Sequence, residues 1–161
     1  MPLIDPCPGC GHPAGRAACQ DLFNDAALRV RELAWTDSMK TWMLMHDTYS
    51  VQHEEDFCGR YKGLVVHLGG LCWALDHGGS PSGYRALQRL IERQSWKDLP
   101  YPPPPGIPQE RGAVTAASLQ GRTEPVTLMS GVDRWARSVW AAYADLQPLA
   151  REWVQQALRL K

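Results

Sequence analysis

The sequence predicts an all-α fold, a single-domain helical bundle of about six or seven helices. Three observations lead to this prediction. Apolar residues recur at steps of three and four along most of the chain, as they do on the buried face of an α-helix. No segment alternates apolar and polar residues for long enough to predict a strand. Glycine and proline fill several of the stretches between the periodic segments, where they favour turns.

The chain length is typical of one domain. With 161 residues, the chain can bury roughly two-thirds of its unfolded surface. We therefore expect residues 1–161 to form one unit. Within it we expect an N-terminal zinc-knuckle segment over 1–18, a helical core over 19–95, a proline-rich connector over 96–112 and C-terminal helices over 113–161.

The charge and hydropathy of the chain argue against nucleic-acid and membrane partners. The chain has 17 basic and 17 acidic residues, so no net charge attracts a polyanion. No run approaches the roughly 18 apolar residues that span a bilayer. The N-terminus also lacks the basic flank and apolar core of a signal peptide. We therefore expect a cytoplasmic protein whose partner is an unidentified protein or small molecule.

The N-terminal segment predicts a zinc site. Cys7-Pro-Gly-Cys10-Gly11 places two thiols two residues apart, and the glycine allows a tight turn in which both sulfurs face one metal ion. The chain has five cysteines, an odd number, so metal binding in a reducing compartment explains them better than disulfides do. Zinc is the metal that this motif favours.

The first half of the chain predicts three helices after the knuckle. Residues 17–35 repeat apolar residues on one face. A second helix, capped by Asp37 or Ser38, is predicted to end near His53, and a third to cover 57–76. Gly78-Gly79-Ser80-Pro81 then ends the third helix, because glycine accepts the left-handed cap conformation and proline cannot continue the helix.

The second half predicts four further helices and the connector. A helix over 82–94 is followed by residues 99–108, where six of ten residues are proline. Such a segment favours an extended arm, which can be a stiff connector, a docking strap or a lid. The remaining predicted helices cover 116–120, 130–146 and 148–160. The last of them begins with a proline in its first turn.

The short connections predict where the other metal ligands lie. If the first three helices pack antiparallel, the start of the first, the end of the second and the start of the third meet at one end. Cys19, His53 and Cys58 occupy those positions. We therefore predict a zinc site of Cys7, Cys10, Cys19 and His53, with Cys58 as the substitute for Cys19. Two alternatives remain: Cys19 and Cys58 are small core residues, or Cys7 and Cys10 form a redox pair.

A second group of polar residues is predicted deeper in the bundle. His46, Tyr49 and His53 share one helix face, and Asp47 lies about 100° around the helix from His46. His67 lies midway along the next predicted helix. Asp47, Tyr49, His53 and His67 can form a catalytic metal site, with Asp47 and His67 as catalytic candidates, or a hydrogen-bond network. His53 cannot serve both this group and the cysteines.

The order of the motifs resembles a known family. The motifs are Cys7-Pro-Gly-Cys10-Gly11, Ala18-Cys19, Asp47-Thr-Tyr49-Ser-Val-Gln52-His53, His67-Leu68 with Leu71-Cys72, and Trp135-Ala136-Arg-Ser-Val139-Trp140. In this order they resemble a bacterial family of uncharacterised proteins, domain-of-unknown-function family 5946. The resemblance implies that the three cysteines and His53 belong to one element, but it implies no activity. Family members often have proline directly after the histidine and histidines near the C-terminal tryptophan helix, where this chain has Glu54 and Leu146-Gln147. These departures weaken any metal site that uses the C-terminal helices.

Three functions agree with this sequence. The first is a protein with a structural zinc ion that binds a partner or small ligand through the bundle surface or the proline-rich connector. The second is a metal-dependent enzyme, hydrolase-like, that uses Asp47, His53 and His67 around an open metal position. The third is a redox-responsive protein that releases zinc when Cys7 and Cys10 are oxidised.

Overall fold

The structure, a computed structural model, describes residues 5–160, and every regular element in that range is a helix. The α-helices are α1 (Gly15–Arg31), α2 (Trp35–Gln52), α3 (Glu54–Phe57), α4 (Tyr61–His77), α5 (Pro81–Arg93), α6 (Pro125–Ala142) and α7 (Gln147–Arg159). Two 3₁₀ helices, η1 (Ala116–Leu119) and η2 (Ala144–Leu146), precede and follow α6. The prediction of an all-α fold is confirmed.

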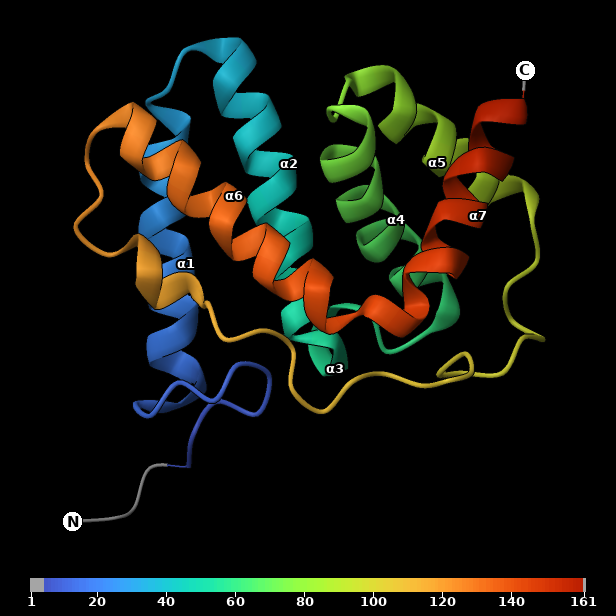
Figure 1. Cartoon of the computed structure of the whole chain (residues 1–161), viewed down its shortest axis with the longest axis horizontal. Helices are drawn as coiled ribbons and strands as arrows, with labels where there is room; N and C mark the ends of the chain where they lie inside the picture. The colour runs from blue at the N-terminus through green and yellow to red at the C-terminus, as the bar shows by residue number, and fades with distance from the viewer. Residues whose placement is uncertain (1–4, 161) are drawn as a thin grey trace.

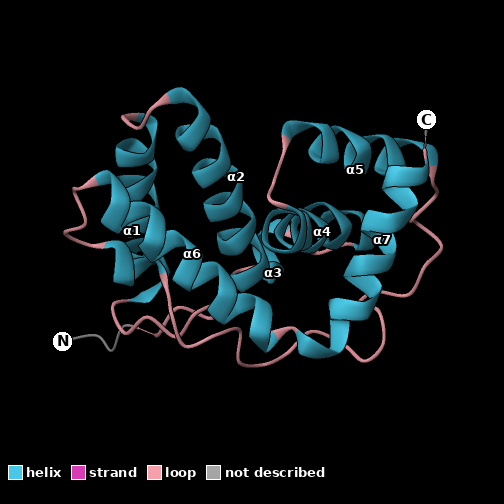
Figure 2. Cartoon of the chain, turned by 45° about the horizontal axis from the view of Figure 1, so that its top comes forward, coloured by secondary structure: helices cyan, strands magenta, loops and turns pink. Residues whose placement is uncertain are grey.

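Helix α4 lies at the centre of the structure. Helix α2 packs along one side of it, and α5 and α7 pack along the other, so that α4 is seen nearly end-on between the two groups in Figure 2. Helix α1 packs on α2, and α6 runs obliquely across α2 (Figure 1). The chain direction alternates from α1 to α2 to α4, so the start of α1, the end of α2 and the start of α4 share the lower end of Figure 1.

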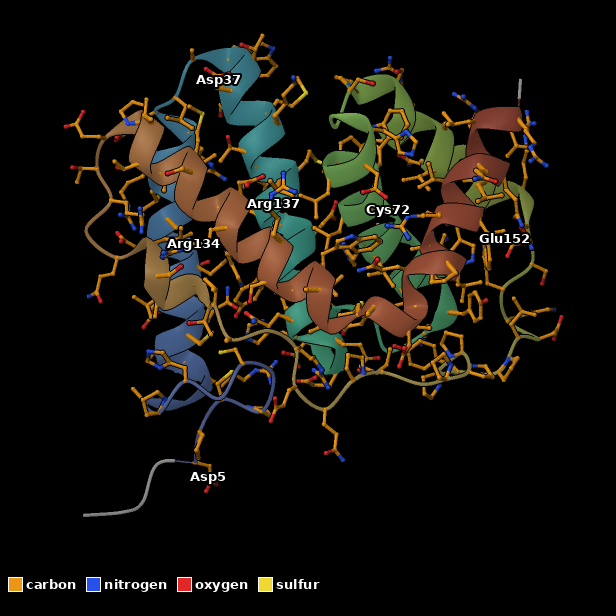
Figure 3. The ribbon with its side chains drawn as sticks, viewed as in Figure 1. Asp5, Asp37, Cys72, Arg134, Arg137 and Glu152 are labelled. Carbon is orange, nitrogen blue, oxygen red and sulfur yellow. The ribbon has the colours of Figure 1, made fainter. Side chains whose placement is uncertain are left out.

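The apolar periodicity of the sequence produces this packing. Helix α4 buries Leu64, Leu68 and Leu71 completely, as its central position requires. Helix α6 is amphipathic: its buried residues include Trp135, while its outer face carries exposed charged residues, among them Arg134 and Arg137 (Figure 3). Burial of large side chains on the α4 and α6 faces supplies the main driving force for folding.

The prediction of one helix over 57–76 was wrong. The structure has the short helix α3, a break at residues 58–60, and then α4. Gly59 adopts a positive φ of 53° and Arg60 is extended, so the helical hydrogen-bond pattern cannot continue through them. Gly63 then lies close to the Cys58 backbone, where a Cβ would be 2.5 Å from the carbonyl oxygen. The chain therefore turns tightly between α3 and α4.

Helix α6 starts earlier than the sequence predicts. It begins at Pro125 rather than near Ser130. Proline is well tolerated at this position, because the N–H group that it lacks would have no partner in the first turn of a helix. It ends at Ala142, and the short helix η2 then leads into α7.

None of the helices in residues 5–160 is long and apolar enough to cross a bilayer.

The proline-rich connector between α5 and η1 has no regular secondary structure. It leaves the end of α5, passes along the lower end of the helices and approaches the N-terminal segment (Figure 1). The peptide bonds before Pro102 and Pro105 are cis. The connector thus reaches the same end of the structure at which α1 begins and α2 ends.

Candidate metal centre

The knuckle is a tight turn closed by backbone hydrogen bonds. The amide of Gly11 donates to the Cys7 carbonyl at 2.7 Å, and the Cys7 amide donates to the His12 carbonyl at 2.9 Å. Gly11 has a φ of +72°, a conformation that glycine adopts without steric cost. The turn holds Cys7 and Cys10 on one side of the loop, as zinc knuckles require.

The other two ligating side chains come from the helix ends that meet there. Cys19 lies in the second turn of α1, and His53 directly follows the last residue of α2. Cys7, Cys19 and His53 are all buried, and Cys10 is partly buried. The N-terminal segment therefore covers the place where the start of α1 meets the end of α2 (Figure 1).

Four potential ligand atoms converge at this junction. The sulfurs of Cys7, Cys10 and Cys19 and one ring nitrogen of His53 all lie within 4.8 Å of one another. The Cys10 and Cys19 sulfurs are 3.4 Å apart, and the Cys19 sulfur is 3.2 Å from His53 Nε2. Ligand atoms bonded to a tetrahedral zinc ion at about 2.0 to 2.3 Å lie roughly 3.3 to 3.8 Å apart. The cluster can therefore hold a metal ion.

The ring of His53 is fixed in the orientation that a metal ligand needs. Its Nδ1 lies 2.9 Å from the Tyr49 carbonyl oxygen, so Nδ1–H donates there and the Nε2 lone pair faces Cys19. The Tyr49 ring stacks on the imidazole, with the centroids 4.0 Å apart. A hydrogen bond from the second nitrogen is the usual way in which proteins set the tautomer of a ligating histidine.

The pKa values of the Cys10 and Cys19 thiols are shifted in opposite directions. A hydrogen bond from the Cys19 thiol lowers the pKa of Cys10 to about 4, although burial opposes this. The same hydrogen bond raises the pKa of Cys19, together with burial and the neighbouring sulfurs. Burial, and then the nearby Cys19, also raises the pKa of the Tyr49 hydroxyl. One thiolate is thus already present at neutral pH, and a bound cation would favour the ionisation of the others.

The remaining cysteines lie outside the cluster. Cys58, the predicted substitute for Cys19, is buried beside α2, where its thiol donates to the Ser50 carbonyl at 3.7 Å. Burial raises its pKa, so it stays a neutral thiol. Cys72 lies on α4, far from the N-terminal segment that begins at Asp5 in Figure 3. Burial raises its pKa to about 12.

The second predicted group of polar residues forms with a different membership. His53 faces the cysteines and does not join Asp47 and His67, which corrects the predicted trio around one metal. His46 takes its place: one ligand atom from each of His46, Asp47 and His67 lies within 4.8 Å of the others. Residues 5–160 therefore contain two separate groups of side chains that can hold a metal ion.

One comparison with known proteins gives a match. The family model described as "Family of unknown function (DUF5946)" matches residues 5–144, which include both groups. The chain belongs to this family. No curated protein and no solved structure matches it. The resemblance inferred from the motifs is confirmed at the level of the family.

In this member of the DUF5946 family, Gln52 joins the cluster of three cysteines and His53 to the rest of the fold. Its side chain is fully buried, and its Nε2 donates to the carbonyls of Arg111 at 3.0 Å and Val114 at 2.9 Å. Its Oε1 accepts a hydrogen bond from Trp135 Nε1 at 3.0 Å. Gln52 thus holds both the end of the connector and α6, directly beside His53. Neither the apolar periodicity nor the motif spacing of the sequence predicts this role of Gln52.

The connector is also held by charge. Arg111 donates to the carbonyl of Gln52 at 3.3 Å and pairs with the carboxylate of Glu55. A cavity of about 520 Å³ lies between the knuckle, residues 7–11, and the connector, residues 109–113. The connector therefore acts as a strap over the end of α2 and forms one wall of a cavity at the knuckle.

Proposed function

We propose that this DUF5946 protein binds one zinc ion through Cys7, Cys10, Cys19 and His53, and that the ion is structural. The observation that supports the proposal is the convergence of three sulfurs and one oriented imidazole nitrogen in a buried position. Three thiolates and one imidazole are a common ligand set of structural zinc sites. The ion would fasten the N-terminal segment to α1 and α2.

A site with four protein ligands has a consequence for the activity. It leaves no open position at which zinc can bind water or a substrate. The protein would therefore act by binding a partner protein or a small ligand through another part of its surface, with the zinc ion keeping the helices in place. We place this activity in the cytoplasm, where a reducing environment keeps cysteines available as metal ligands.

The test compares two cysteines in different positions. Cys7→Ser removes a proposed ligand. Cys58→Ser removes a thiol that is also buried at this end of the fold but does not belong to the cluster. We expect purified wild-type protein and Cys58→Ser to contain one equivalent of zinc, measured by elemental analysis. We expect Cys7→Ser to lose the metal and to unfold without cooperativity. Full zinc content in Cys7→Ser would reject the proposal.

A second measurement distinguishes a structural centre from a catalytic one. Cobalt(II) replaces zinc with the same ligands, and its visible spectrum reports both the thiolates and the coordination number. We expect a four-coordinate spectrum with thiolate charge-transfer bands, unchanged when small competing anions are added. His67→Ala should keep this spectrum, since His67 lies in the other group. With one equivalent of cobalt(II), a five- or six-coordinate spectrum that keeps the thiolate bands would indicate an open position on the metal, as in a catalytic centre.

A further inference from the structure

His46, Asp47 and His67 form a group of metal-ligating side chains that the proposed zinc centre does not use. The Nδ1 atom of His67 lies 3.0 Å from Asp47 Oδ1, and the Nδ1 atom of His46 lies 3.8 Å from the same oxygen. The two imidazole rings are close to each other, with centroids 5.3 Å apart. Atoms bonded to one cation at about 2.0 to 2.2 Å lie roughly 3 to 3.5 Å apart. The three atoms are thus nearly at the spacing of a coordination shell.

The carboxylate of Asp47 is incompletely satisfied by the protein. The residue is 2% exposed, yet Oδ2 has no hydrogen-bond partner among residues 5–160. A buried carboxylate oxygen without a partner destabilises the folded state, because it has lost its hydrogen bonds to water and no protein group replaces them. His67 satisfies only Oδ1. A positive charge bound at the carboxylate would reduce this cost by neutralising the buried negative charge.

The neighbouring helix leaves room for the carboxylate. Gly70 of α4 faces Asp47, and a Cβ at that position would overlap with Asp47 Oδ2. The absence of a side chain at Gly70 therefore lets the carboxylate lie directly against α4. On the outer side solvent reaches the group mainly at His46, whose side chain is 37% exposed, while that of His67 is 13% exposed. A hydrated cation can reach these two rings.

A simple histidine–aspartate hydrogen bond explains only part of this arrangement. It accounts for His67 and Asp47 Oδ1, but leaves Oδ2 unpaired and leaves His46 Nδ1 3.8 Å from Oδ1, too far for a hydrogen bond. A cation among the three atoms engages both rings and neutralises the carboxylate. We propose that His46, Asp47 and His67 form a second metal site, for a first-row transition-metal dication.

The ligand set defines the class of metal. Two imidazoles and one carboxylate bind Fe(II), Mn(II), Co(II) or Zn(II) and leave further coordination positions for water or a small ligand. Cysteine is absent from this group, so soft ions have no advantage there. The second site is thus chemically different from the sulfur-rich centre, and the two can be occupied by different metals.

The experiment uses the full chain loaded with one equivalent of zinc. Cobalt(II) is then added, and binding is followed by calorimetry and by visible spectroscopy. We expect one further equivalent to bind, with the weak bands of nitrogen and oxygen ligands and without thiolate charge transfer. His46→Ala, Asp47→Asn and His67→Gln should each weaken this step by at least about tenfold. The control His77→Gln changes the exposed last residue of α4 and should bind as the wild type does.

Two outcomes would overturn the proposal: no second equivalent in the wild type, or a second equivalent that binds all three variants with unchanged affinity. Circular dichroism shows whether each variant is folded. If Asp47→Asn or His67→Gln is unfolded, His46→Ala decides, because His46 is the most exposed of the three side chains, at 37%, and its removal should disturb the core least. The absence of thiolate bands in the added signal separates this result from any failure of the zinc centre.

Discussion

Gly9 lies directly against the imidazole of His53. A Cβ at Gly9 would be 2.5 Å from His53 Cδ2 and 2.8 Å from the Gln52 carbonyl oxygen, both closer than atoms in contact can be. The backbone of the knuckle therefore packs on the end of α2 only because residue 9 has no side chain. The position of the two knuckle cysteines relative to His53 depends on this contact.

Gly9→Ala should therefore weaken both metal binding and folding. We expect the variant to displace the knuckle or the ring and to lower the free energy of unfolding by about 1 to 3 kcal/mol. Its zinc affinity should fall as well, measured by competition with a chelator. Pro8→Ala is the matched control, since Pro8 is exposed in the same turn. Equal zinc affinity in the two variants would show that the contact is unimportant.

Cys10 should be the most reactive cysteine of the metal-free protein. Its pKa of about 4 makes it a thiolate at neutral pH, and it is only partly buried, whereas Cys58 and Cys72 are buried thiols with raised pKa values. We expect iodoacetamide to label Cys10 first, as located by peptide mass spectrometry. One equivalent of zinc should protect it. Labelling of Cys72 at the same rate would contradict the assignment.

Gln52→Ala should destabilise the fold strongly although Gln52 is not a proposed ligand. The change leaves Trp135 Nε1 and the connector carbonyls of Arg111 and Val114 without their partner. We expect a loss of about 2 to 4 kcal/mol in the free energy of unfolding, measured with urea. Gln88→Ala, at an exposed position of α5, should change stability by less than about 0.5 kcal/mol. Similar losses in the two variants would argue against the network.

Glu54 and Glu55 should respond oppositely to pH. Although burial opposes it, the hydrogen bond from Arg111 lowers the pKa of Glu55 below its ordinary value of 4.5. Its stabilising effect is thus present above pH 4.5 and is lost as the pH falls through the folded-state pKa. Burial raises the pKa of Glu54, so its neutral form is favoured in the fold and its ionised form is destabilising at neutral pH.

Substitution of each glutamate by glutamine tests this difference. At neutral pH, Glu55→Gln should lower the free energy of unfolding by up to about 1 kcal/mol, because the ion pair with Arg111 is partly exposed. Glu54→Gln should raise it. Both differences from the wild type should shrink in acid below pH 4.5, as followed by urea unfolding at each pH. Effects of the same sign at neutral pH would contradict the assignment.

Much of the architecture could be predicted from the sequence, for identifiable reasons. The three- and four-residue apolar spacing of α1, α2 and α4 indicated helices, and short connections forced these helices to alternate in direction. Cys19 and His53 were thereby expected at the same end as the knuckle, and the structure brings their ligand atoms together. Local pattern and simple topology were sufficient for this part.

The polar interior of α2 could not be predicted in the same way. From Asp47 to Glu54 every residue is buried, although the segment reads as largely polar. Its burial depends on the connector, which returns from about 60 positions later in the chain to accept the hydrogen bonds of Gln52. No periodicity within α2 reveals a partner that distant. Six of the eight residues from 47 to 54 are polar, so the sequence alone favours a solvent-facing helix surface rather than a buried one.

The adjacency of Gln52 and His53 has a consequence for the proteolytic behaviour of the protein. One side chain holds the connector and the next would hold the metal, so a shift of their shared backbone moves both. Removal of zinc with a chelator should then loosen residues 109–113 and expose the peptide bond after Arg111 to trypsin. Loss of zinc near the amino end of the chain would thus be detectable as proteolytic cleavage at a position roughly one hundred residues further along the sequence.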